Sequence, residues 1–70
     1  MMPLMLASPG AEQIIKRVGG SQEVKKHLED MGFVPGGGVT VISVIGGNVI
    51  VRVKESRVAI SKEMAQKIMV

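Results

Sequence analysis

Two runs rich in β-branched residues, 39–45 and 49–54, form the clearest hydrophobic pattern in the chain. Gly46-Gly47-Asn48 separates them, and these residue types accept the positive φ angles of hairpin turns. The two runs therefore predict a β-hairpin. In the second run three valines alternate with a mostly basic face, so we expect the core to contain Val49, Val51 and Val53.

The hydrophobic period changes after Ser21 from that of a strand to that of a helix. Three apolar residues follow at i, i+4 and i+7, and they form one helical stripe of Val24, Leu28 and Met31. Ser21 can cap the first turn through its hydroxyl group, and Gly32 accepts the left-handed conformation that ends many helices. We predict a helix over about residues 21–31 that covers the core with one face.

The other apolar segments predict short strands between turn residues. Residues 12–18 lie between Pro-Gly and Gly-Gly pairs and predict a first strand. Residues 33–36, Phe-Val-Pro-Gly, predict a type II turn, because proline fixes φ at its second position and glycine permits a positive φ at its third. Residues 57–60 predict another strand, 62–67 a short helical turn after a serine cap, and 68–70 a closing strand.

One mostly β, small α+β domain over residues 1–70 accounts for these elements, since a chain this short supports a single core. Four or five short strands with one inserted helix favour a bent sheet that closes as a small barrel. Residues 1–7 are apolar but lack the basic region of a signal peptide, and they are far shorter than the roughly 20 residues of a membrane span. We expect them to form an ordered edge of the fold, with no insertion into a membrane.

Composition excludes several kinds of chemistry. The chain contains no cysteine, which rules out disulfides, thiol nucleophiles and iron–sulfur ligation and suits a reducing cytosol. One histidine and six scattered carboxylates give no group of residues typical of a catalytic site, so we predict that the protein is not an enzyme. The net charge of +3 is explained by solubility as well as by an acidic partner.

The best candidates for a metal site are His27 and Glu23, which share a helix face at i and i−4. Two ligands do not make a protein-built site, so the favoured interpretation is a solvated or half-buried helix histidine, with no metal and no other cofactor. The glycine-rich segments 19–20 and 36–38 lack the residues of a phosphate loop and are interpreted as turns. Nucleic-acid binding is also disfavoured, because Phe33 is the only aromatic residue available for base stacking.

The order of these features resembles the FeoA family. The similarity begins with Leu4-x-Leu6 before Pro9-Gly10 and continues with Leu28-x-x-Met31-Gly32-Phe33-Val34-Pro35-Gly36, which resembles the family's L-x-x-[LM]-G-[LF]-x-P-G signature. It closes with Ala65-x-x-Ile68-x-Val70 and so covers nearly the whole chain. One departure is Glu55-Ser56, which stands where the family often has a glycine followed by a large residue.

The resemblance implies an SH3-like barrel of about five strands with an inserted helix. It also implies a small accessory protein of ferrous iron uptake in the prokaryotic cytosol, which binds and modulates the GTP-binding region of the FeoB permease at the inner membrane. From expected exposure alone, we predict a partner surface made of Lys25, Lys26, Met31, Phe33, Arg52 and Lys54.

An alternative from another functional class is a domain that binds a divalent transition metal weakly and reports it to a partner, as the similar domain of iron-dependent repressors would. Self-association is a further expectation, because small barrels leave sheet edges and apolar residues such as Ile42 and Ile50 near the surface.

Overall fold

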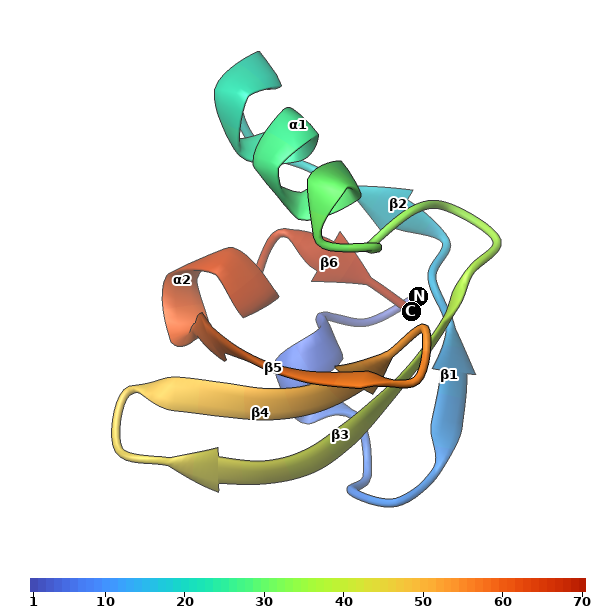
Figure 1. Ribbon diagram of the computed structural model, residues 1–70, viewed down its shortest axis with the longest axis vertical. Coiled ribbons are helices and arrows are strands. Elements are labelled where there is room, and N and C mark those ends of the chain that lie inside the picture. Colours follow the sequence, from blue (N-terminus) through green and yellow to red (C-terminus); the bar gives the residue numbers. More distant parts are fainter.

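Six strands in two antiparallel sheets, two short α-helices and one 3-10 turn make up the computed structural model, which describes residues 1–70 (Figure 1). The larger sheet has the strand order β1-β3-β4-β5, and the smaller sheet pairs β2 with β6. In chain order the elements are η1 (Leu4–Leu6), β1 (Glu12–Ile14), β2 (Arg17–Val18), α1 (Gln22–Asp30), β3 (Gly38–Ile45), β4 (Asn48–Val53), β5 (Ser56–Ser61), α2 (Lys62–Ala65) and β6 (Ile68–Met69).

The prediction of one continuous first strand over residues 12–18 is wrong, because the chain changes sheets within it. The Ile15 amide donates to the Gly37 carbonyl, and the Ile15 carbonyl accepts from the Gly36 amide, both at 2.8 Å. The amide of the next residue, Lys16, instead donates to the Met69 carbonyl at 2.8 Å. Neighbouring residues thus pair with different segments, and the predicted strand divides into β1 and β2.

The predicted hairpin is confirmed as β3 and β4, which pair from Val39↔Val53 to Ile45↔Asn48 with a register shift after Val41. The alternation in β4 is also confirmed: Val49, Val51 and Val53 are at most 2% exposed. Lys54 lies just beyond β4 rather than inside it. The valines face inward together because successive side chains of a strand point to opposite faces of the sheet.

Local capping explains where α1 begins and ends. The Ser21 hydroxyl accepts a hydrogen bond from the Val24 amide at 3.3 Å, and Gly32 has φ +104, so both predicted ends are confirmed. The type II turn is confirmed by the Gly37 amide donating to the Val34 carbonyl at 2.9 Å and by φ +88 at Gly36. Neither α-helix is long and apolar enough to cross a bilayer.

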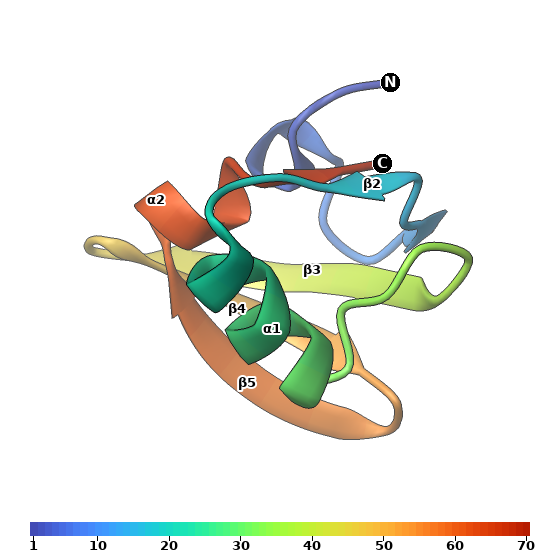
Figure 2. The ribbon, with the colours of Figure 1, turned by 90° about the horizontal axis from the view of Figure 1, so that it is seen from above.

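The two ends of the chain are paired to each other. The Met2 amide donates to the Val70 carbonyl at 2.9 Å, and the Val70 amide donates to the Met2 carbonyl at 2.8 Å. A further bridge joins Pro3 to Met69, so the first residues extend the small sheet beside β6 (Figure 2). Leu4 in η1 is fully buried. The apolar start is therefore an ordered edge of the fold, as predicted.

A single cluster of fifteen buried apolar residues fills the space between the two sheets and the helices. Phe33 has the largest of the fully buried side chains, and Leu28 on α1 is also completely buried. No polar or charged side chain is buried. The chain therefore places all of its charged groups at the surface.

The turn between β4 and β5 contains two non-glycine residues with positive φ, Lys54 at 49° and Glu55 at 66°. These angles correspond to a type I′ turn, which favours Asn and Gly because a Cβ atom is strained there. This is the position where the sequence departs from the FeoA pattern. The chain still turns into β5 at this position, but with Lys54 and Glu55 in strained backbone conformations.

Glu55→Gly is expected to stabilise the fold by about 0.5–1 kcal/mol, because relief of roughly 1–2 kcal/mol of strain exceeds the entropic cost of glycine. Chemical denaturation checks this value. The matched control is Gly46→Ala in the other hairpin, where φ is +57 and no atom lies within 4 Å of an added Cβ. The free energy of unfolding of Gly46→Ala should be lower by at least about 1 kcal/mol through backbone strain alone. A destabilised Glu55→Gly variant would contradict the assignment of strain.

Phe33→Ala is expected to cost about 3–5 kcal/mol, because it removes the largest buried side chain and leaves a cavity. Leu6→Ala serves as the control, since Leu6 is 68% exposed, and it should change stability by less than about 0.5 kcal/mol. Thermal and denaturant unfolding of both variants measures the difference. Equal stabilities would contradict the placement of Phe33 in the core.

Candidate functional site

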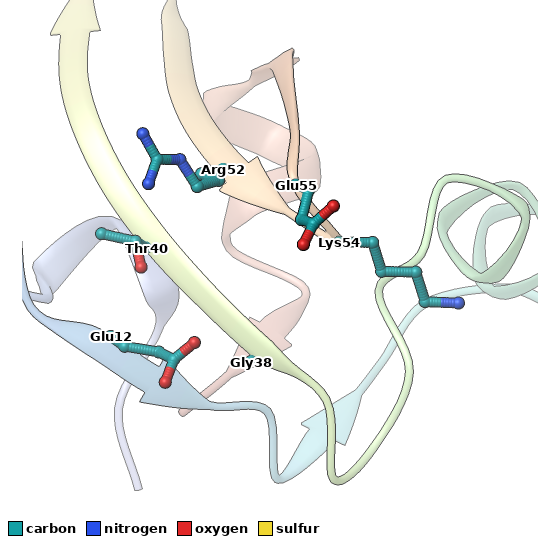
Figure 3. Close-up of a pocket in the computed structure, with 6 residues that line it drawn as sticks. All are labelled: Glu12, Gly38, Thr40, Arg52, Lys54 and Glu55. Carbon is teal, nitrogen blue, oxygen red and sulfur yellow. The ribbon is translucent and has the colours of Figure 1, made fainter.

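The outer face of the four-stranded sheet carries a polar hollow of about 300 Å³. Its lining residues come from β1, β3, β4 and the β4–β5 turn, and Figure 3 shows them: Glu12, Gly38, Thr40, Arg52, Lys54 and Glu55. We call this feature the outer hollow. None of its lining residues is hydrophobic.

Strand register explains why these residues meet. Glu12 is directly opposite Thr40, Thr40 is opposite Arg52, and Arg52 is opposite Arg57. Residues directly opposite each other in a sheet share a face, so these four side chains form one row across β1, β3, β4 and β5. Glu12 and Arg52 lie on either side of Thr40 in Figure 3. We call this set the charged row.

Gly38 makes room for the carboxylate of Glu12. A Cβ atom at Gly38 would lie 2.7 Å from Glu12 Oε2, which is closer than real Cβ contacts, and 3.1 Å from its Cδ. The Glu12 side chain therefore lies directly against the backbone of β3. A side chain at position 38 would push this flexible carboxylate away from the hollow.

The outer hollow is suited to recognition by charge. It combines two carboxylates, Glu12 and Glu55, with two cations, Arg52 and Lys54, and all four residues are exposed. Exposed charges interact weakly and are screened by salt, so each contributes more to orientation and partner choice than to fold stability. Thr40, which is partly buried, is the only hydroxyl-bearing residue among those lining the hollow.

The predicted metal candidates lie elsewhere, on the exposed side of α1. His27 and Glu23 are both exposed and are separated by one helical turn. No group of three or more His, Cys, Asp or Glu side chains that could hold a metal ion occurs in the structure. A metal-responsive role therefore stays a prediction, carried by these two residues alone.

The six residues of the predicted partner surface fall into different environments. Arg52 and Lys54 line the outer hollow, whereas Lys25 is half-buried and Lys26 exposed on α1. The Lys54 side chain reaches Gly32 at the end of α1, since its Cδ lies 3.3 Å from where a Cβ on Gly32 would be. Lys54 thus lies between the hollow and the end of the helix.

The two apolar residues of the predicted partner surface, Met31 and Phe33, are less exposed than expected. The prediction for Phe33 is wrong, because its side chain is 0% exposed and cannot contact a partner in this fold. Met31 is partly buried and packs against the core. Ile42 and Ile50, which were expected near the surface, are also partly buried, and self-association stays a prediction.

Sequence reasoning did not select Glu12, Thr40 or Glu55. Thr40 and Glu12 come together only through the pairing of β1 with β3, and no local motif marks either residue. The one available signal was the turn chemistry at Glu55, where a glutamate occupies a position that favours glycine.

Comparison with known proteins identifies the family. The FeoA domain pattern matches residues 2–70. This chain belongs to the FeoA family. It is 37% identical, over all 70 residues, to an Fe(2+) transport protein A of Methanocaldococcus jannaschii, of which it covers 85%. The family acts in ferrous iron transport as an accessory protein and is not an enzyme family.

Solved structures of the family have the same fold. One is the crystal structure of an iron uptake regulatory protein, FeoA, with a TM-score of 0.89, 32% identity, and coverage of 99% of this chain and 92% of the other. Another is the solution structure of iron(II) transport protein A from Clostridium thermocellum, with a TM-score of 0.89 and 30% identity over 97% of this chain and 43% of the other. The predicted SH3-like small β fold with an inserted helix is thereby confirmed.

A third structure, an FeoA protein from Chlorobium tepidum, has a TM-score of 0.87 at 21% identity and covers 97% of this chain and 67% of the other. At that identity the similarity concerns the fold alone. The fold is therefore retained at low sequence identity.

Arg52 and Arg57 are like charges directly opposite each other, an arrangement that destabilises a sheet. Arg57→Glu is therefore expected to raise the free energy of unfolding by about 0.5 kcal/mol at low salt. The gain should shrink as salt rises, because exposed charges are screened. Arg57→Gln removes the repulsion without adding an attraction. Its free energy of unfolding should therefore lie between those of the unmodified protein and of Arg57→Glu. Denaturant unfolding at two salt concentrations measures the effect, and a salt-independent loss of stability would contradict it.

Proposed function

We propose that this chain is an adaptor of ferrous iron uptake that binds the cytosolic GTP-binding region of a FeoB-type permease and modulates its transport. It acts in the prokaryotic cytosol, next to the inner membrane through its partner. It works through its surface and not by catalysis. The supporting observation is the exposed outer hollow, in a fold of a ferrous iron transport family, with Arg52 and Lys54 among its lining residues.

The burial pattern supports recognition through the exterior. All buried side chains are apolar and belong to one cluster, so the charged groups remain available to a partner. The outer hollow offers both signs of charge on a rigid sheet, which favours an oriented complex. Lys54 extends this surface toward the end of α1, so one partner could contact the sheet and the helix together.

Association should be measured by calorimetry between this protein and the purified cytosolic region of the FeoB permease from the same genome, without nucleotide, with GDP and with a GTP analogue, and each with and without Fe(II). We expect binding in at least one state, weakened by salt. The double variant Arg52→Glu/Lys54→Glu should weaken binding at least about tenfold, because it reverses two interface charges.

The matched control is Lys16→Glu/Arg17→Glu, which changes the net charge equally at two exposed residues outside the hollow. It should leave the affinity close to that of the unmodified protein. Equal weakening by both double variants would point to net charge rather than to the outer hollow. Absence of binding in every nucleotide and iron state would refute the adaptor function.

A further inference from the structure

Strand β5 leaves one edge of the larger sheet open. It is the last strand in the order β1-β3-β4-β5 and pairs only with β4 (Figure 2). The two-residue turn makes Val53 and Ser56 a hydrogen-bonded pair, and the pattern then alternates along the strand. The amide and carbonyl groups of Arg57 and Ala59 consequently point away from β4.

No other backbone segment satisfies these groups. Outside the sheets and helices, the backbone hydrogen bonds of the structure include none made by Arg57 or Ala59. Both residues are also exposed. An exposed edge strand of this kind is a ready template for an additional strand.

The charges along this edge favour an acidic partner strand. Arg57 lies on the edge itself, Arg52 is directly opposite it on β4, and Lys62 follows the end of β5. The acids that flank this strand in the sequence are Glu55, which lines the outer hollow, and Glu63 on α2. A second copy of this chain paired through β5 would bring further arginines to this edge, which is unfavourable. An acidic side chain beside Arg57 would instead relieve the repulsion between Arg57 and Arg52.

The inner face of β5 adds an apolar contact. Val58, between Arg57 and Ala59, is partly buried and packs against the core cluster. Because side chains alternate along a strand, the residue of an added strand opposite Val58 would point to the same inner face. An apolar residue there would extend the core.

We propose that the open edge of β5 binds an extended segment of the partner protein as a fifth strand of the larger sheet. The backbone of the segment pairs with Arg57 and Ala59. The segment places an acidic residue opposite Arg57 and an apolar residue opposite Val58. The inference rests on the proposed function in one respect: the protein that supplies the segment is the cytosolic region of the permease.

Ala59→Pro tests the backbone pairing. The Ala59 amide points away from β4, so proline removes the donor offered to a partner while leaving the pairing with β4 intact. Affinity for the cytosolic region of the permease should fall at least about tenfold. The matched control is Ile14→Pro on the open side of β1, where the amide also points away from its sheet, and this variant should bind normally. Amide NMR spectra verify that both variants are folded.

Arg57→Glu separates binding from folding, because the free variant is expected to be more stable while its affinity for the partner falls. A synthetic six-residue peptide alternating Glu and Val supplies a second probe. It should shift the amide NMR signals of residues 57–59, whereas the corresponding Lys–Val peptide should not.

The outcomes distinguish this proposal from the proposed function. Normal binding by Ala59→Pro, or an equal loss in Ala59→Pro and Ile14→Pro, would overturn the edge site while leaving the adaptor function intact. A permease region that fails to bind the unmodified protein, together with an acidic peptide that shifts residues 57–59, would refute the adaptor function and support the edge site with another acidic partner. Equal shifts with both peptides would overturn the charge assignment.

Discussion

The period-two alternation of β4 is the constraint on which the rest of this structure depends. Val49, Val51 and Val53 are buried in the core, and β4 is paired on both sides, with β3 and with β5. A slip of one residue in either pairing would turn the valines to solvent and bring Arg52 into the core. The burial of three valines therefore fixes the register of the three longest strands.

The same register determines the exterior. Once the valines point inward, Arg52 must point outward, and its cross-strand neighbours Thr40 and Arg57 must share its face. The charged row and the outer hollow are thus consequences of how the core is packed. The two hairpin turns hold this arrangement, one with glycine at a positive φ and one with Lys54 and Glu55 in strained conformations.

Closure of the fold depends on pairing between residues that are far apart in the sequence. The first residues pair with the last ones, and β2 pairs with β6, so the small sheet forms only when both ends of the chain meet. This arrangement leaves β5 as an open edge of the larger sheet. Strand β5 thereby combines an exposed charged side chain, Arg57, with backbone groups that pair with no other segment.

Local signals in the sequence determined the helix, the two hairpin strands, the turn at residues 34–37 and the inward face of β4, because caps, turn residues and periodicity act over a few residues. Expected exposure placed Arg52 and Lys54 among six predicted partner residues, and that surface stays a prediction. Only the tertiary structure decided that residues 12–18 divide between two sheets, that Phe33 is buried, and that Glu12 joins Thr40 and Arg52. These features depend on strand pairing and packing between distant segments, which no short stretch of sequence encodes.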